Sequence, residues 1–490
     1  MDYDRLQTLK SCAICHKCVG ETFLSDEIKN EGKARTCHYC KRRRKSFLLE
    51  EMAARVAQAF ERHYQRTPRD PDGYEYAMLR DPEIDYTWYR DGEPTADAIT
   101  SAADISVDAA RDLQQILDDE YGDYHSMEVG EETEFADDAH YEEIMPGDRE
   151  WRESWWEFER SIRSEARFFS RTAAQKLGAL FDDIDRMRTR GGAPLIVSAG
   201  PETNLTLFFR ARVFQSDSKL VSALERPDLH LAAPPNSLAA AGRMNAKGIS
   251  TFYGATDPSI ALAEVRPPVG SQVAVAKFEI IRPLKLLDLN ALKDVHERGS
   301  IFDPDYADRL SRMMFLRSLC DRMARAVMPD DQDFEYLPTQ ATADFLATEG
   351  KVPLDGILFP SPQAGSAGLN AVLFHKASKC EALPLPKGTK IEASTAQQYA
   401  EGWEREYTVW ETVPKQEPEK PKVKPQGLSF FHMKTADWEE NRDGDSRLPT
   451  LRIDPNSVQV HVVNAINIDS SPHQVTRYRH EDRGTERDDF

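Results

Sequence analysis

The sequence predicts an α+β protein in which a metal-binding segment and a helical region precede a domain of mixed strands and helices. Three observations support this fold class. Five of the seven cysteines lie within the first forty residues, apolar residues recur at helical spacing between residues 46 and 190, and strand-like runs alternate with helices from residue 195 onward. A chain of 490 residues can bury several hydrophobic cores, and about three domains are expected.

The first segment, residues 1–45, carries two CxxC pairs, Cys15/Cys18 and Cys37/Cys40, with eighteen residues between them. This spacing is typical of a structural zinc site, in which each pair supplies two thiolates to one tetrahedral ion. A segment this small has too little apolar surface to fold alone, so metal binding and folding are expected to be coupled. Because four thiolates leave no open coordination position, we expect the zinc to be structural.

The spacing also allows other ligand sets. Cys12 makes a further CxxC with Cys15 and can take the place of Cys18, and His16 and His38 are weaker candidates. The competing interpretation is five unrelated reduced cysteines, since disulfides are uncommon in a reducing cytosol.

Residues 46–195 are expected to form a helical domain with an acidic loop. Apolar residues recur at helical spacing in two stretches, at Phe47, Leu48, Met52, Val56 and Phe60 and at Trp151, Trp155, Phe158, Ile162, Phe169, Leu177, Phe181 and Ile184. Residues 118–150 hold fourteen Asp and Glu and one Arg, which favours a solvated loop outside any core over a partner-binding segment. The sequence RGGAP at 190–194 indicates a domain boundary.

Residues 196–400 are expected to form the mixed domain. The strand-like runs are LTLFFRARVF, STFYGA, VAVAKFEII, LKLLDL, DGILFPSP and NAVLF, and helices are expected at 306–327 and from residue 336. The remaining residues, 401–490, are expected to contain a Pro/Lys/Glu linker at 411–430, a two-stranded hairpin at 449–468 and a polar tail.

Charge and hydropathy narrow the functional classes. The net charge of −20 argues against a general nucleic-acid binder, and no apolar run approaches the roughly 18 residues of a membrane span. The first residues lack the apolar stretch of a signal peptide. We therefore expect a cytoplasmic protein with no membrane partner.

One stretch of the mixed domain, AGRMNAKGISTFYGATDPSIALAEVR (residues 241–266), places three polar side chains where core packing does not require them. Arg243 follows Gly242 in a turn, where the backbone can approach a ligand closely. Tyr253 ends a short strand, and Glu264 lies on a helix otherwise built of small and apolar residues. Taken singly, they also fit a surface arginine, a core tyrosine and a solvent-facing glutamate.

The order of these residues resembles the RES domain, a family named for its arginine, glutamate and serine. The resemblance covers roughly residues 200–380, and the matching positions are Arg210, Gly242, Arg243, Met244, Asn245, Gly248, Tyr253, Ala255, Glu264, Pro360, Ser361 and Asn370. The chain departs from the family pattern at two positions, because Met244 replaces the usual aromatic residue and Ala211 stands where some members have tyrosine. Arg212 is an alternative for the first arginine.

RES domains resemble ADP-ribosyltransferase-like enzymes and act on NAD, breaking its nicotinamide–ribose bond. The resemblance implies that Glu264 stabilises an oxocarbenium-like ribose. It implies that Arg210 and Arg243 hold the pyrophosphate with planar bidentate hydrogen bonds, and that Tyr253 stacks on the nicotinamide.

The resemblance also assigns Asn245 and Ser361 to substrate binding through hydrogen bonds. Ser361 is not expected to be a nucleophile, because no histidine is placed to suggest a triad.

The N-terminal half, with its CxxC pairs and the later WEFERSIRSEARFF segment, is similar to the HEPN/RES N-terminal domain. Ribonucleases of the HEPN class use an R-x4–6-H pair, and here Arg226 and His230 are one residue too close. The helical half is therefore not expected to cleave RNA.

Three functions follow from the resemblance. The first is a toxin that consumes NAD as a glycohydrolase or phosphorylase, in a toxin–antitoxin or phage-defence setting. The second is an ADP-ribosyltransferase that modifies a protein, and the third is a catalytically degenerate zinc-containing binding module. The resemblance implies NAD as substrate and an antitoxin or regulatory protein as partner, and it leaves open whether the chain forms an oligomer. No nucleic acid is expected to bind the RES domain directly.

Overall fold

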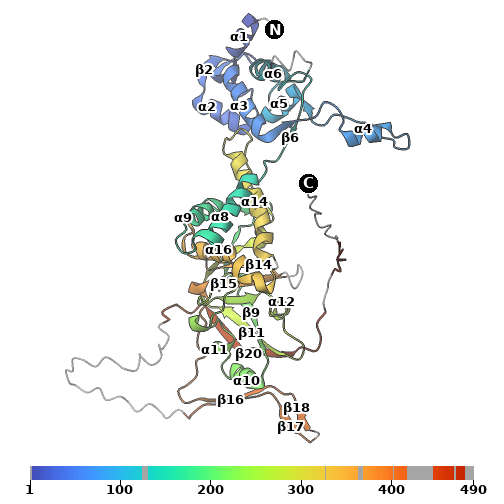
Figure 1. Cartoon of the computed structure of the whole chain (residues 1–490). Helices are drawn as coiled ribbons and strands as arrows, with labels where there is room; N and C mark the ends of the chain where they lie inside the picture. Colours follow the sequence, from blue (N-terminus) through green and yellow to red (C-terminus); the bar gives the residue numbers. More distant parts are fainter. Residues whose placement is uncertain are drawn as a thin grey trace, which may run out of the picture.

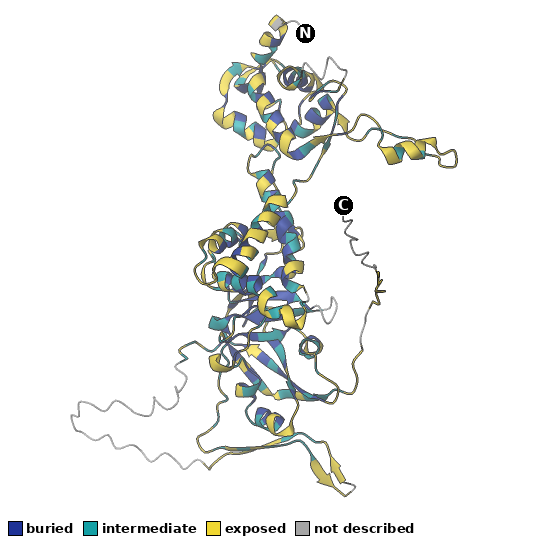
Figure 2. Cartoon of the chain, in the orientation of Figure 1, coloured by how far each residue is buried: buried dark blue, intermediate teal, exposed yellow. Residues whose placement is uncertain are grey.

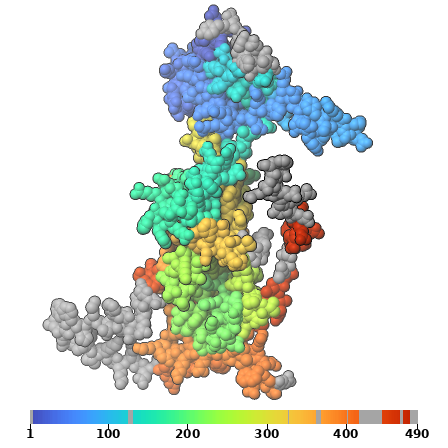
Figure 3. Space-filling model, viewed as in Figure 1, coloured from blue at the N-terminus to red at the C-terminus, as the bar shows by residue number. Residues whose placement is uncertain are grey.

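The structure, a computed structural model, describes residues 3–123, 131–325, 327–361, 368–400, 402–415, 445–467 and 471–479. It is elongated, with an N-terminal unit at one end and a large sheet at the other (Figure 1). The long helix α14 (Tyr306–Ala324) lies between them, and the space-filling view narrows at that level (Figure 3). The mixture of helices and sheets confirms the predicted α+β class.

The N-terminal unit begins with a three-stranded antiparallel sheet in the order β1-β3-β2. Its elements are α1 (Tyr3–Lys10), β1 (Ala13–Cys15), α2 (Thr22–Glu31), β2 (Lys33–Thr36) and β3 (Arg43–Leu48). Three helices complete its core, α3 (Leu49–His63), α5 (Thr95–Ala103) and α6 (Val107–Tyr121). A second small sheet has the order β4-β6-β5, with β4 (Tyr64–Arg66), β5 (Glu93–Pro94) and β6 (His140–Glu143). Helix α4 (Gly73–Arg80) has no buried residue and protrudes from the unit (Figure 2).

The expectation that residues 118–150 form a solvated loop outside any core is wrong in part. Phe135, Ala139 and Tyr141 are buried in the N-terminal core although acidic residues surround them in the sequence. The side chain of Glu132 is 7% exposed and receives two hydrogen bonds from Arg90. Residues 124–130 of this stretch lie outside the described residues.

The helical domain expected at residues 46–195 is divided between two cores. One core contains the helices α8 (Arg149–Arg160) and α9 (Arg171–Leu180) and the π-helical turn at 161–165. They pack there with α14, with α16 (Leu337–Thr348) and with strand residues of the large sheet. Helices α3, α5 and α6 bury their apolar faces in the separate N-terminal core.

The large sheet has eight strands in the order β20-β11-β9-β10-β15-β14-β12-β8. Their bounds are β8 (Ile196–Ala199), β9 (Leu207–Phe214), β10 (Phe252–Ala255), β11 (Gln272–Ile280), β12 (Leu284–Asp288), β14 (Gly356–Pro360), β15 (Leu369–Leu373) and β20 (Leu451–Val462). The six strand-like runs of the sequence are thereby confirmed. Short helices accompany the sheet, α10 (Asp217–Glu225), α11 (Pro227–His230), α12 (Pro258–Glu264), α13 (Leu289–Leu292) and α15 (Gln332–Glu335).

Strand pairing is uneven in the middle of this sheet. Strands β9 and β11 pair over eight residue positions, whereas β9 and β10 pair only at Phe209 and Ala255. Pairing between these two strands is therefore confined to one end of the short strand β10.

The two-stranded hairpin expected at 449–468 is wrong. Residues 451–462 form one strand, β20, which pairs with β11 at the edge of the large sheet and buries Leu451 and Ile453. The register shifts between Val275 and Lys277, where the hydroxyl of Ser457 accepts a hydrogen bond from the backbone N–H of Lys277. Residues 451–462 are thus part of the large sheet and not a separate hairpin.

Four shorter strands form two ribbons near the edge of the domain, β16 (Lys390–Ser394) with β19 (Thr408–Thr412) and β17 (Gln397–Tyr399) with β18 (Gly402–Glu404). Strand β7 (Arg188–Thr189) pairs with β13 (Val295–His296). Most of the linker expected at 411–430 lies outside the described residues. Among the residues that the structure does describe, no helix combines the length and apolarity that crossing a bilayer requires.

Candidate active site and metal centre

A cavity of about 250 Å³ lies beside β9 and β10. Its walls are formed by residues of β9, β10, α12, β14 and β15 and by the residue after α12. The lining residues are Arg210, Ala211, Tyr253, Gly254, Ala261, Glu264, Val265, Phe359 and Asn370. A Cβ atom on Gly254 would lie 2.7 Å from the ring of Phe252 and 3.0 Å from a carbonyl of β9, so this wall position requires glycine. The cavity brings together Arg210, Tyr253 and Glu264, which the sequence singled out separately.

Glu264 is the last residue of α12, a helix whose start is fixed by Asp257 accepting a hydrogen bond from the backbone N–H of Ser259. The Oε1 atom of Glu264 accepts hydrogen bonds from Ser361 Oγ at 2.5 Å and from Asn370 Nδ2 at 2.8 Å. Two hydrogen bonds to one carboxylate oxygen fix the orientation of the carboxylate. Ser361 directly follows β14, and Asn370 is the second residue of the neighbouring strand β15. The two residues thus orient Glu264 against the cavity.

Arg210 contributes a cation to the cavity wall. Among the residues that the structure describes, no acidic side chain forms an ion pair with it. Its guanidinium donates a hydrogen bond to the carbonyl of Tyr253 at 3.1 Å and lies 5.1 Å from the ring centroid of Phe252. Burial and the nearby charge of Arg212 lower the pKa of Arg210 to about 10, so the group stays charged at neutral pH. A positive charge placed in this way favours an anionic ligand.

The structure distinguishes Arg210 from the alternative, Arg212. Arg212 donates a hydrogen bond to the carbonyl of His230 and lies outside the cavity lining. Arg210 is therefore the arginine of β9 at the candidate site.

Tyr253 lies in the second position of β10 rather than at its end, so that detail of the sequence prediction is wrong. Its hydroxyl donates to Asn245 Oδ1 at 2.7 Å and accepts from the backbone N–H of Met244 at 3.0 Å. Burial raises the pKa of the Tyr253 hydroxyl to about 12, which keeps it protonated as this donor. The ring can contact a ligand in the cavity while the hydroxyl holds the neighbouring turn.

Asn245 is buried and its amide donates to three carbonyls, those of Ala240, Ala246 and Ile249. A Cβ atom on Gly242 would lie 2.6 Å from the Asn245 amide oxygen and 2.7 Å from the Tyr253 hydroxyl. Asn245 and Gly242 therefore build the turn, and neither lines the cavity.

Arg243 also lies outside the cavity lining. Its guanidinium donates to the carbonyls of Met323 and Arg325 at 3.0 and 2.8 Å, at the C-terminal end of α14, and lies 4.9 Å from the ring centroid of Tyr336. These partners favour a cation, because the last carbonyls of a helix carry partial negative charge. The structure thus does not bring Arg210 and Arg243 together as a pair.

Two features of the site were not assigned from the sequence. Asn370 was recognised as a matching position without a role, and its hydrogen bond to Glu264 supplies one. Phe359 forms part of the cavity wall from β14, where its sequence context indicates only a buried strand. Met244, which departs from the family pattern, is 2% exposed and packs in the core shared with α14.

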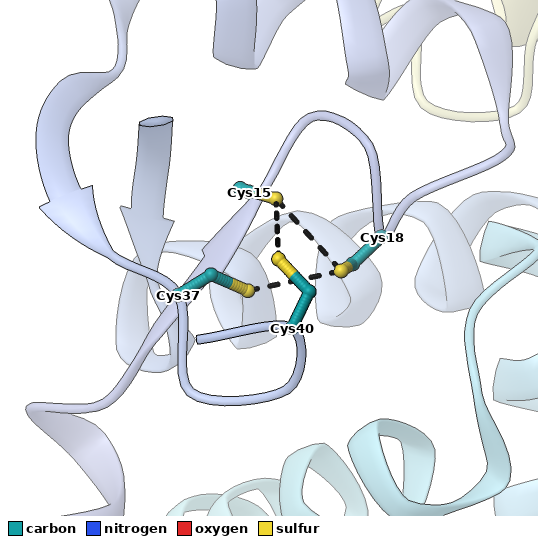
Figure 4. A group of neighbouring side chains, drawn as sticks. All are labelled: Cys15, Cys18, Cys37 and Cys40. Carbon is teal, nitrogen blue, oxygen red and sulfur yellow. Dashed lines mark hydrogen bonds between the residues drawn. The ribbon is translucent and has the colours of Figure 1, made fainter. Parts of the chain in front are cut away.

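The four cysteines Cys15, Cys18, Cys37 and Cys40 form a separate group in which all sulfur atoms lie within 4.8 Å of one another (Figure 4). The Sγ–Sγ distances are 3.8 Å between the first pair, 3.6 Å from Cys15 to Cys40 and 3.7 Å from Cys18 to Cys37. A tetrahedron with Zn–S bonds of about 2.3 Å has edges of about 3.8 Å. The group therefore has the dimensions of a tetrahedral metal site.

The alternative ligands lie elsewhere. Cys12 Sγ is 3.4 Å from His38 Nδ1, and His16 Nδ1 is 3.3 Å from the carbonyl of Lys45. Within the group, the backbone N–H of Arg42 lowers the pKa of Cys40 to about 7, whereas burial raises the pKa of Cys15 and of Cys18.

Comparison with protein families agrees with this organisation. Residues 211–396 match the family model of the RES domain. The match begins one residue after Arg210, includes Tyr253, Glu264, Ser361 and Asn370, and ends before β20. The searches of curated proteins and of solved structures gave no match to this chain.

Proposed function

We propose that this chain, which contains a RES domain, consumes NAD by cleaving its nicotinamide–ribose bond in the cavity between β9 and β10. One observation carries the proposal. An oriented carboxylate, Glu264, and a cation with no acidic partner among the described residues, Arg210, line the same cavity. NAD offers a matching pair of groups, since its ribose becomes positively charged during bond cleavage and its pyrophosphate is an anion.

The cavity volume bears on which part of NAD it encloses. About 250 Å³ is below the roughly 300–1,000 Å³ typical of sites that bury a drug-sized ligand. We therefore place the nicotinamide and its ribose in the cavity, with the adenosine half outside. The ring of Tyr253 supplies an aromatic wall for the nicotinamide.

The chemistry needs few groups. The bond between the nicotinamide nitrogen and ribose C1′ breaks, and its electron pair leaves with nicotinamide, which becomes neutral. The ribose passes through an oxocarbenium-like state that a carboxylate stabilises. Glu264 Oε1 is held by two donors, so Oε2 is the oxygen that can face the ribose. Water then adds at C1′ and releases a proton, which gives ADP-ribose; phosphate in place of water gives the phosphorylase reaction.

We propose different roles for the two arginines. Arg210 contacts the pyrophosphate or the phosphate nearest the ribose, because it is the charged group on the cavity wall. Arg243 reaches NAD only if its guanidinium leaves the carbonyls at the end of α14. Ser361 and Asn370 act as positioning residues through Glu264.

We propose that the cysteine group holds one zinc ion with a structural role. Zinc suits four thiolates, and bound there it would fasten β1 to the loop before β3. The cysteine group belongs to the N-terminal core, so the reaction at Glu264 does not depend on zinc for any chemical step.

The cellular role that we propose is that of a cytoplasmic toxin that depletes NAD and is held in check by an antitoxin or another protein. The support for this role is the match to the RES domain. The HEPN-like character of the helical region stays a prediction.

The test incubates the purified chain with NAD carrying a label in the adenylate and follows free nicotinamide and labelled products. Nicotinamide with free ADP-ribose supports a glycohydrolase, and nicotinamide with phosphate-dependent ADP-ribose phosphate supports a phosphorylase. Label retained on a protein points instead to an ADP-ribosyltransferase. If NAD stays intact, the cavity belongs to a binding module.

A further inference from the structure

A second cavity, of about 350 Å³, lies in the N-terminal unit and has aromatic walls. Five aromatic rings line it, those of Phe60, Tyr64, Tyr121, Phe135 and Tyr141. Phe60 stacks on Tyr64 at 4.2 Å and meets Tyr141 edge-on at 5.2 Å. The cavity belongs to the core of α3, α6 and β6, and it shares no lining residue with the cavity at Glu264.

The backbone of Phe135 is held in an uncommon conformation to place its ring in this wall. Its φ is 57°, in the left-handed region that large side chains seldom adopt. Two buried hydrogen bonds fix it there, from its N–H to the Tyr141 hydroxyl at 3.0 Å and from Gln114 Nε2 to its carbonyl at 2.8 Å. Strain that is maintained by neighbouring groups is common where a ligand binds. The ring of Tyr121, 46% exposed, meets Phe135 at 5.5 Å on the solvent side.

The charges at this cavity favour a cation. Glu61 and Glu134 contribute to its lining, and neither has an ion-pair partner among the described residues. Among the described lining residues the one cation is Arg66, which donates to the carbonyl of Glu132 and lies 3.7 Å from its carboxylate. The rings and the two unpaired carboxylates thus present negative potential to a ligand.

We propose that this cavity binds an alkylammonium cation. The positive group would lie against the faces of Tyr64, Tyr121 and Phe135, with Glu61 and Glu134 supplying the counter-charge. Phosphates and carboxylates are disfavoured there by the same two glutamates. The cation can be a free molecule such as choline or a methylated lysine side chain on a partner protein, and the shared chemistry is an ammonium group with alkyl substituents.

The experiment measures binding to the full-length chain by calorimetry, with choline and with its neutral isostere 3,3-dimethylbutanol. We expect choline to bind at least about 10-fold more tightly, because only the charged ligand gains cation–π and carboxylate interactions. N-acetyl trimethyl-lysine amide, measured in the same way, distinguishes a free cation from a methylated lysine side chain. If it binds more tightly than choline, the ligand is a side chain; if it binds more weakly, the ligand is a free cation.

Tyr121→Leu should weaken choline binding about 10-fold without changing the melting temperature, because the ring is half-exposed. Tyr89→Leu is the matched control, since Tyr89 is 79% exposed and outside the cavity lining. Glu134→Gln should weaken choline binding and leave the binding of the neutral alcohol unchanged. Equal affinity for both probes, no choline binding at millimolar concentration, or an unchanged affinity in Tyr121→Leu would each overturn the proposal. The measurement is independent of NAD cleavage.

Discussion

Asn370 donates a hydrogen bond of 2.8 Å to Glu264, although 106 residues separate them in the chain. The same carboxylate oxygen accepts from Ser361, which directly follows β14, so two donors from adjacent parts of the sheet fix one oxygen of one acid. An acid held in this way loses little further freedom when a substrate binds. Pre-organisation of this kind is what electrostatic stabilisation of a developing positive charge requires.

Glu264→Gln should lower kcat for nicotinamide release by about 10²–10³-fold and change KM little, because the interaction lost is strongest in the transition state. Initial rates with purified protein measure both constants. Glu349→Gln, at an exposed position after α16, is the matched control and should behave as the unchanged protein. A Glu264→Gln variant with full activity would remove Glu264 from the mechanism. In cells the same variant should be tolerated without growth arrest.

Arg210→Ala should raise KM for NAD more than it lowers kcat, because a contact to the phosphates acts in the ground state and in the transition state alike. Arg212→Ala is the control on the same strand and should leave KM near its original value, since Arg212 lies outside the cavity lining. If the KM for NAD stays near its original value in both variants, β9 supplies no phosphate contact.

Arg243→Ala should destabilise the protein by about 2 kcal/mol, because two hydrogen bonds from a charged donor to α14 are lost. Thermal unfolding measures this effect. The resemblance to ADP-ribosyltransferase-like enzymes predicts a different result, in which the KM for NAD rises and the stability changes little. The two readouts therefore separate a structural from a substrate-binding role for Arg243.

Purified protein should contain about one zinc ion per chain, measured by elemental analysis. Cys37→Ser should remove the ion and lower the melting temperature of the N-terminal unit, because thiolate coordination and folding are coupled. Cys12→Ser is the matched control and should retain the metal, since Cys12 lies outside the group of four. Metal-free protein with an unchanged melting curve would contradict the assignment.

The elements of the sheet domain could be predicted from the sequence because their strands are buried on at least one face and leave clear apolar runs. Strand β8 (Ile196–Ala199) was not among the predicted runs, and β20 was predicted as two strands instead of one. Asp454, Pro455 and Asn456 are residues typical of a turn, and they interrupt the alternation that a strand should show. In the structure they lie where the register shifts against β11, an irregularity that an edge strand accommodates.

The site was predictable in composition and less so in arrangement. Arg210, Tyr253 and Glu264 meet at one cavity as the order of the residues implies. The orientation of Arg243 depends on carbonyls 80 and 82 residues away, at the end of a helix, and a local sequence pattern carries no information about them. The aromatic cavity was missed for a similar reason, because Phe135 lies within a run of acidic residues that predicts a solvated loop.

Helix α14 links the two halves of the molecule physically. At one end, Tyr306 stacks on His63 at 5.7 Å and Arg62 donates to the carbonyl of Pro304; at the other end, its carbonyls hold Arg243. Its 19 residues span about 28 Å as a nearly rigid rod. If a ligand of the N-terminal unit displaces α14, the displacement also changes the free energy of the turn that carries Arg243, because Arg243 is bonded to the end of this helix. Thermodynamic reciprocity then requires NAD to alter the affinity of the N-terminal unit for that ligand by the same factor. Choline titrations with and without NAD, in the Glu264→Gln variant to prevent turnover, measure this coupling, and identical affinities would show the two sites to be independent.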